Sequence, residues 1–243
     1  MLVEFPVPAN VDPAFWEPGE AAMKVFGDAD LVLANGADYS MWIMGSGLDK
    51  DKIIYTTEAL QDRILFDTQA QRNKSHAYTT WLDFQMASAQ ARAIYDTLVG
   101  LMPDHKKEMN LRFRQLKVEL EGLDRQLIRY SQNNKGKAFV TSYPVYQYLG
   151  QRYHFDIHSL IWMPDQIPNE REWKKLIAIL KEQQARTMLW NAEPRPEVRQ
   201  ELEKIGLKLF VFDPCANRPE NGDFMSVMWD NVYRLTESGK LKE

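Results

Sequence analysis

The sequence is poor in cysteine, in excess positive charge and in long apolar runs, and each shortage excludes a class of protein. Its single cysteine, Cys215, cannot form a disulfide within the chain, so packing alone must hold the fold. No apolar run approaches the roughly 18 residues that span a bilayer, so we expect no transmembrane helix and no direct membrane insertion. Lys and Arg number 30 against 34 Asp and Glu, a net charge of -4, which argues against nucleic acid as a partner.

Sequence patterns that would indicate catalysis are also missing. The glycines of residues 45–47 lack the spacing of a dinucleotide- or phosphate-binding loop, and no G-x-S-x-G pattern occurs. Among the few histidines, His154 and His158 are four residues apart and are expected on one face of their segment. Two imidazoles do not complete a metal site, so we interpret both as partly exposed residues at the entrance of a strand. We therefore predict that the protein is not an enzyme and expect no cofactor.

The composition and the apolar pattern predict an α/β fold. Hydrophobic residues make up 44% of the chain and charged residues 26%, as in ordinary globular proteins, and 243 residues suit one large domain or two smaller lobes. Short apolar runs alternate with amphipathic stretches, which indicates mainly parallel sheets flanked by helices. Strands are expected over residues 30–35, 52–55, 138–141, 187–190 and 207–212. The last run is almost continuously apolar, which predicts burial on both faces, and Gly206 is placed to end the helix before it.

Apolar residues at helical spacing separate these strands. Helices are expected over residues 20–26, 84–102, 169–182 and 197–205. Asp83 can cap the second of these helices, because its carboxylate can accept hydrogen bonds from the free amides of the first turn. The third helix is expected to bury one face, made of Trp173, Leu176, Ile177 and Leu180.

The longest expected helix begins after Pro103 and ends near Tyr130. Its apolar residues are three or four positions apart, at Phe113, Leu116, Leu120, Leu123, Leu127 and Tyr130. At about 1.5 Å per residue this helix is roughly 40 Å long, more than one lobe needs to cover its own sheet. We therefore expect an amino-terminal lobe over residues 1–103, a long linking helix over residues 104–131, and a carboxyl-terminal lobe over residues 132–243.

Ordered motifs along nearly the whole chain carry a family resemblance. They begin with VPANVDPAFWEP at residues 7–18 and ADLVLANGADYSMW at residues 29–42, followed by TTWLDFQ at residues 79–85 and FVTSY at residues 139–143. Tyr148 and RY at residues 152–153, PDQIP at residues 164–168, NAEPRP at residues 191–196 and FDP at residues 212–214 complete the series. In this order they resemble the solute-binding proteins of zinc and manganese ABC transporters, the periplasmic metal-binding type called cluster A-I.

The resemblance implies two α/β lobes joined by one long helix, with a divalent metal in the cleft between them. It implies a monomer outside the cytoplasmic membrane that delivers its metal to an ABC permease. Residues 1–10 lack the basic and apolar regions of a secretory signal, so we expect no signal peptide in this chain. The family's leader, first strand and first helix would precede Met1, so the amino-terminal lobe is expected to be incomplete at its start.

The residues at the family's metal-ligand positions differ from the family pattern. Where the family has three histidines and a further His or carboxylate, this chain has Ala14, Thr79, Tyr143 and Asn191, and only Asp213 remains of the family's ligands. A methyl group supplies no ligand atom, and neutral hydroxyl, phenol and amide groups are poor ligands for zinc, which prefers imidazole or thiolate. The histidine-rich loop of many zinc-uptake members is reduced to NKSH at residues 73–76. The resemblance therefore implies a degenerate site with weak or no zinc binding.

Four alternatives stay open at this stage. The oxygen atoms of Thr79, Tyr143, Asn191 and Asp213 would suit a harder divalent cation, bound weakly. Cys215 and Asp213, with Glu193 nearby, could form a different site at the end of a strand. An organic or chelated solute could stack on aromatic rings beside the motifs, at Trp16, Trp81, Trp162 and Trp190. Finally, the cleft could be filled by side chains, leaving an interaction or structural protein on the same fold.

Overall fold

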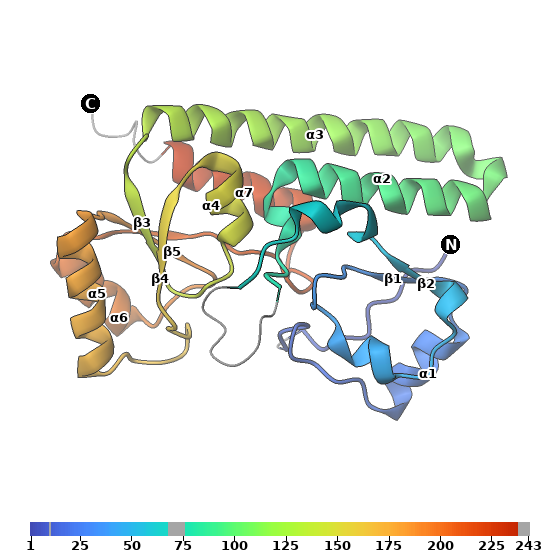
Figure 1. Cartoon of the computed structure of the whole chain (residues 1–243), viewed down its shortest axis with the longest axis horizontal. Helices are drawn as coiled ribbons and strands as arrows, with labels where there is room; N and C mark the ends of the chain where they lie inside the picture. Colours follow the sequence, from blue (N-terminus) through green and yellow to red (C-terminus); the bar gives the residue numbers. More distant parts are fainter. Residues whose placement is uncertain (10, 68–75, 238–243) are drawn as a thin grey trace. The chain divides into compact units, whose positions relative to one another are not determined.

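A computed structural model describes residues 1–9, 11–67 and 76–237 of the chain. The chain divides into two compact units (Figure 1). Unit 1 contains Met1–Glu121 and Cys215–Asp223, and unit 2 contains Gly122–Pro214 and Phe224–Glu243. The predicted α/β class with parallel sheets flanked by helices is confirmed. Residues 132–243 were expected to form one lobe, whereas Cys215–Asp223 belongs to unit 1.

Unit 1 is built on a parallel pair of short strands. Strand β1 (Val32–Ala34) pairs with β2 (Ile53–Tyr55), and both lie within the predicted ranges. Its helices are α1 (Glu20–Asp28) and α2 (Phe84–Leu101), and the first part of α3 (Lys106–Asn133) also belongs to it. Among its described residues, unit 1 also has five 3-10 helices, at Met41–Gly45, Lys50–Lys52, Glu58–Arg63, Thr80–Leu82 and Pro103–His105.

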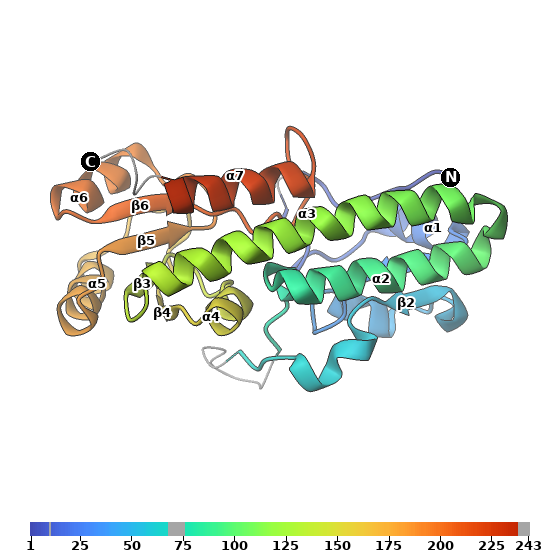
Figure 2. The same ribbon diagram turned by 90° about the horizontal axis from the view of Figure 1, so that it is seen from above.

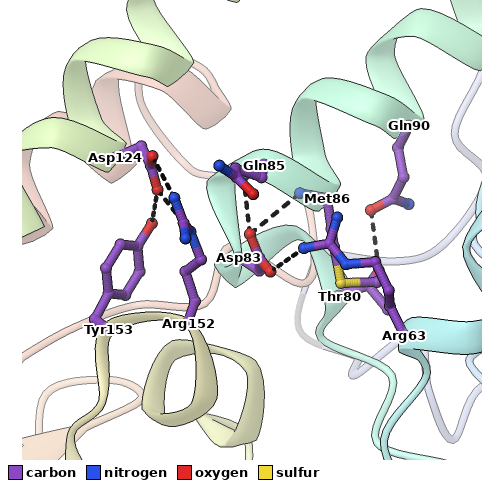
Figure 3. Close-up of polar contacts among 9 residues, drawn as sticks. All are labelled: Arg63, Thr80, Asp83, Gln85, Met86, Gln90, Asp124, Arg152 and Tyr153. Carbon is purple, nitrogen blue, oxygen red and sulfur yellow. Dashed lines mark hydrogen bonds and ion pairs between the residues drawn. The ribbon is translucent and has the colours of Figure 1, made fainter. Parts of the chain in front are cut away.

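The predicted cap of α2 is confirmed and has a second partner. The Asp83 carboxylate accepts hydrogen bonds from the main-chain amides of Gln85 and Met86, at 2.9 and 3.2 Å. Its other oxygen lies 2.7 Å from Nη2 of Arg63 (Figure 3). Because the Asp83 side chain is only 8% exposed, both interactions satisfy a charge that has little access to water.

The segment that returns to unit 1 holds the start of the chain. The side-chain amide of Asn217 donates to the carbonyl oxygens of Pro8 and Val11, at 2.8 and 2.7 Å. The Arg218 guanidinium donates to the carbonyl of Phe5 at 3.2 Å. Residues more than 200 positions apart therefore fix the first turn of the chain.

Unit 2 contains a four-stranded parallel sheet in the order β4-β3-β5-β6. The strands are β3 (Ala138–Thr141), β4 (Asp156–Ser159), β5 (Thr187–Trp190) and β6 (Lys208–Val211). Helices α5 (Glu170–Gln183) and α6 (Pro196–Lys204) cover one face, while α4 (Gln147–Tyr153) and α7 (Phe224–Glu237) lie on the other (Figures 1 and 2). The core beneath α5 and α6 includes Val140, Met188, Leu176, Val198 and Leu202, all at most 2% exposed.

Three expectations for unit 2 were wrong in detail. Strand β4 was missed, because its sequence DIHS is polar and it is an edge strand. Strand β6 is only partly buried, because it is the other edge strand and pairs with β5 alone, whereas β3 is buried at all four residues. Ile177 is 46% exposed, since α5 presents Trp173, Leu176 and Leu180 to the sheet. The expected helix-ending role of Gly206 is confirmed by its φ of +79° directly after α6.

Helix α3 has the predicted long apolar stripe. It is 28 residues long, and Leu120, Leu123 and Leu127 are at most 2% exposed. The division between the two units falls within it, between Glu121 and Gly122. None of the helices among residues 1–9, 11–67 and 76–237 combines the length and the hydropathy needed to cross a membrane.

A partly buried ion pair joins α4 to the part of α3 that belongs to unit 2. Arg152 donates from Nε and Nη2 to the two carboxylate oxygens of Asp124, at 3.0 and 2.7 Å (Figure 3). The Tyr153 hydroxyl donates to the same carboxylate at 3.0 Å. This bidentate geometry orients α4, which begins four residues after Tyr143.

Candidate functional site

In unit 2, three of the predicted site residues follow neighbouring strands. Tyr143 comes two residues after β3, Asn191 directly after β5, and Asp213 two residues after β6. Because these strands are parallel and adjacent, all three residues leave the sheet at its carboxyl edge. This is the edge where open α/β sheets bind their ligands. The candidate site within unit 2 is therefore this carboxyl edge.

The Asn191 side chain already has a protein partner at this edge. The hydroxyl of Ser142 donates to Oδ1 of Asn191 at 3.1 Å, and Ser142 itself is fully buried. The main-chain amide of Asn191 lies 3.4 Å from the same hydroxyl. One lone pair of the amide oxygen is thus occupied, which makes Asn191 a weaker ligand for a cation.

The main chain at Phe212 and Asp213 is fixed by two buried side chains. The Tyr146 hydroxyl donates to the Phe212 carbonyl at 2.6 Å. The amide of Asp213 donates to Oδ1 of Asn231 at 3.1 Å, and Nδ2 of Asn231 donates to the Asp213 carbonyl at 2.7 Å. Tyr146 is 0% exposed and Asn231 2% exposed. The backbone of Asp213 is therefore held in place by hydrogen bonds within unit 2.

The charge of Asp213 acts on the Tyr146 phenol. Burial is the main cause that raises the pKa of Tyr146 well above its ordinary value, and the negative charge of Asp213 raises it further. Both effects oppose a phenolate. Tyr146 therefore stays protonated and keeps its hydrogen bond to the Phe212 carbonyl.

In unit 1, the two predicted ligand positions lie in turns. Thr79 is 1% exposed and immediately precedes a 3-10 helix. The main-chain amide of Ala14 donates to Oδ1 of Asp12 at 2.9 Å, which closes a local turn. Ala14 offers only its methyl group as a side chain, so this turn supplies no side-chain ligand at position 14.

A buried polar network stands beside Thr79, at the carboxyl end of β1 and β2. Gln90 donates from Nε2 to Oδ1 of Asn35 at 2.7 Å and to the hydroxyl of Thr56 at 2.8 Å. The Thr80 hydroxyl lies 3.0 Å from Oε1 of Gln90 (Figure 3). Thr80, the residue after Thr79, is thus held in place by hydrogen bonds within the protein.

Cys215 and Trp81 both lie near Tyr39 in unit 1. The ring centroids of Tyr39 and Trp81 are 5.3 Å apart, and the Tyr39 hydroxyl donates to the Ala216 carbonyl at 2.6 Å. Burial is the main cause that raises the pKa of the Tyr39 phenol, and negative charge on Asp12, Tyr78 and Cys215 would raise it further. Cys215 has a φ of +53°, and its thiol donates to the Asn217 carbonyl at 3.7 Å.

Comparison with known proteins identifies the family at this point. A family model described as ZnuA, zinc-uptake complex component A, periplasmic, matches residues 2–238. The chain belongs to this family. Among its relatives is the high-affinity zinc uptake system protein ZnuA of Bacillus subtilis (strain 168), 24% identical over 255 residues, which cover 97% of this chain and 80% of the relative.

Other relatives match smaller shares of their own length. The zinc-binding protein TroA of Treponema pallidum (strain Nichols) is 24% identical over 154 residues, 62% of this chain and 50% of TroA. Two solved structures share the fold. The metal-dependent lipoprotein YcdH of Bacillus subtilis has a TM-score of 0.82 at 20% identity, over 96% of this chain and 89% of that one. The Zn(II)-bound ZnuA-like domain of Streptococcus pneumoniae AdcA has a TM-score of 0.80 at 22% identity, over 94% and 87%.

The remaining predicted site residues are dispersed over the two units of this family member. Trp16 packs on Trp42 in unit 1, with ring centroids 6.0 Å apart. Trp190 is 0% exposed and lies 6.2 Å from Trp162 in the core of unit 2, which does not support a role in stacking on a solute. Glu193 forms an ion pair with Arg199, at 2.6 Å.

The two histidines do not share a face, contrary to expectation. His154 ends α4 with a φ of 56°, whereas His158 lies in β4 with Nε2 3.1 Å from Asp156. They diverge because a helix ends and a strand begins between them. Within the described part of the chain, no three His, Cys, Asp or Glu residues are grouped so that they could hold a metal. Residues 73–75 of the shortened loop lie outside the described residues.

The sequence alone did not reveal Asn231 and Tyr146, the residues that hold the main chain at Asp213 and Phe212. Asn231 sits among Met228, Val232 and Leu235 on the buried face of α7. A polar residue at a core position of an amphipathic helix is a signal in itself, because a buried amide needs partners. That signal could have identified Asn231, although not the partner to which it bonds.

Proposed function

We propose that this protein is the solute-binding component of a divalent-metal ABC uptake system whose zinc site is degenerate. In this proposal it acts as a monomer outside the cytoplasmic membrane, delivers its cargo to an ABC permease and catalyses no reaction. Membership of the zinc-uptake family supports the transport role. The degenerate site rests on the residues at the positions that match the family's ligands.

The observation that carries the proposal is the chemistry of those positions. Ala14 offers a methyl group, Thr79 is a buried hydroxyl, and Oδ1 of Asn191 already accepts a hydrogen bond from Ser142. Tyr143 and Asp213 add a phenol and one carboxylate. A tight zinc site uses several imidazoles or thiolates, and this set contains neither. Any cation bound here would be held weakly, through oxygen atoms.

Thermal stability separates weak from tight zinc binding. A ligand present at its dissociation constant stabilises the folded state by about 0.4 kcal/mol, and at 1,000 times that constant by about 4 kcal/mol. For a protein of this size, these energies correspond to shifts in Tm of about 1 °C and about 8–16 °C. We expect metal-free protein to gain about one degree or less with micromolar zinc, and a gain of ten degrees would refute the proposal.

A variant with restored histidines provides the matched comparison. The change Ala14→His, Thr79→His and Tyr143→His returns imidazoles to the three positions and keeps Asp213. We expect micromolar zinc to raise the Tm of this variant by several degrees more than that of the wild type. If the variant folds and zinc shifts neither protein, these positions are not the cargo ligands. Parallel titrations with manganese, magnesium and calcium test for a harder cation.

A second candidate is an interaction or structural protein on the same fold. The hydrogen bonds that occupy Asn191 and the main chain of Asp213 favour it, because they satisfy polar groups at the carboxyl edge without a ligand. In that case no divalent cation should shift Tm. Wild-type protein that binds manganese or calcium in the titration above would exclude this candidate.

A further inference from the structure

We propose that Asn231 is a positioning residue: it fixes the main chain of Asp213 and thereby the point from which the Asp213 carboxylate projects. This inference rests on the proposed function only in taking Asp213 as a residue of the cargo site. It assigns a role to α7, a helix that carries none of the positions matched to the family's ligands.

The two hydrogen bonds of Asn231 leave Asp213 little freedom. The carboxamide accepts from the Asp213 amide at 3.1 Å and donates to the Asp213 carbonyl at 2.7 Å. Both main-chain polar groups of one residue are thus held by one planar side chain. Such a pair fixes the peptide planes on either side of the Asp213 Cα, and therefore the direction of its Cβ.

The neighbouring residue is fixed in the same way. The Phe212 amide donates to the Trp190 carbonyl at 2.8 Å, and the Phe212 carbonyl accepts from Tyr146 at 2.6 Å. Every main-chain donor and acceptor of Phe212 and Asp213 therefore has a partner within unit 2. Side chains supply three of these four bonds, in a segment that lies beyond the last residue of β6.

The surroundings of Asn231 argue that its amide serves a specific purpose. Met228 and Val232 on the same helix are 0% exposed, and Asn231 itself is 2% exposed. An apolar residue of similar size would pack at such a position without the desolvation penalty that an amide carries. The amide is compatible with this burial because it bonds the Asp213 main chain.

The test measures Asp213 directly and needs no cargo. Three variants are compared with wild type by NMR: Asn231→Leu removes both hydrogen bonds, and Asn231→Asp keeps the acceptor and loses the donor. Tyr233→Ala alters an exposed position on α7 and serves as the control. The readouts are the hydrogen-exchange rate of the Asp213 amide relative to that of Val140 in β3, and the 13Cα and 13Cβ chemical shifts of Asp213, which report its backbone conformation.

We expect Asn231→Leu to speed exchange of the Asp213 amide about 5- to 150-fold over wild type, as follows from the loss of two neutral hydrogen bonds. The 13Cα and 13Cβ shifts of Asp213 should move as well, and the control should change neither readout. If Asn231→Leu leaves both readouts at their wild-type values, the proposal is wrong.

Asn231→Asp keeps the test decisive if Asn231→Leu does not fold. In that variant the Asp213 amide should stay protected, because its acceptor remains, while the Asp213 13Cα and 13Cβ shifts move, because the Asp213 carbonyl loses its donor. Unchanged shifts would overturn the proposal. Because neither readout uses zinc, failure of the zinc proposal leaves this result standing, and the reverse also holds.

Discussion

Replacing Arg152 with methionine removes the ion pair between α4 and α3 in unit 2 while keeping an unbranched apolar side chain. The Asp124 carboxylate then keeps the Tyr153 hydroxyl at 3.0 Å but loses both guanidinium hydrogen bonds. A partly buried carboxylate that loses its countercharge is poorly solvated. The substitution should therefore destabilise unit 2 well beyond the loss of one surface contact.

The burial of the Arg152–Asp124 pair determines how much stability the substitution removes. Breaking a fully buried ion pair costs about 3–5 kcal/mol. The Asp124 side chain is 14% exposed and that of Arg152 22%, and this partial hydration reduces our expectation to about 2–3 kcal/mol. In a protein of this size, each kcal/mol lowers Tm by about 2–4 °C, so Arg152→Met should melt about 4–12 °C below wild type.

Two further variants make this measurement decisive. Arg112→Met breaks an ion pair of nearly the same length, 2.8 Å to Glu108, whose side chains are 75% and 59% exposed, and it should cost less than about 1 kcal/mol. The double change Asp124→Leu with Arg152→Met removes both charges and should recover part of the lost stability. Differential scanning calorimetry compares all three. Equal losses for Arg152→Met and Arg112→Met would refute the reasoning from burial.

Two more predictions concern unit 1. Gly36 has a φ of +83°, and a β-carbon there would overlap the Thr57 hydroxyl, so Gly36→Ala should lose about 2–4 kcal/mol in urea unfolding. The control Gly27→Ala, in open space on α1, should gain about 0.5–1 kcal/mol, and a similar change in both would contradict this account. Asp83→Ala removes the cap of α2 and the Arg63 pair and should cost about 2–3 kcal/mol, whereas Asp83→Asn keeps an acceptor and should cost less. Thermal melts that rank these two in the opposite order would argue against the capping role.

Local sequence patterns were sufficient for the central elements of the fold. Strands β3 and β5 have the predicted limits because their apolar runs are buried inside the sheet. The stripe of α3 was visible because its apolar residues keep helical spacing from Phe113 to Tyr130, over about five turns. Edge strands follow weaker rules, so polar β4 escaped notice and the burial of β6 was overestimated.

The candidate positions Tyr143, Asn191 and Asp213 came from the family resemblance, and the strand order of the structure brings them to one carboxyl edge. The groups that hold this edge in place could not be predicted, because their contacts join residues far apart in sequence. Tyr146 is 66 positions from Phe212, and Asn231 is 18 from Asp213, distances at which no periodic pattern of apolar residues is informative.

The hydrogen bonds from Asn217 to the Pro8 and Val11 carbonyls constrain the order in which the two units can fold during synthesis. Every strand of the unit 2 sheet ends before residue 217, at or before Val211. A ribosome therefore makes that entire sheet before it makes the amide that secures the first turn of the chain. Unit 1 starts first but stays incomplete until the whole sheet of unit 2 has been made, so a nascent chain that stalls before Asn217 leaves its own beginning unfastened.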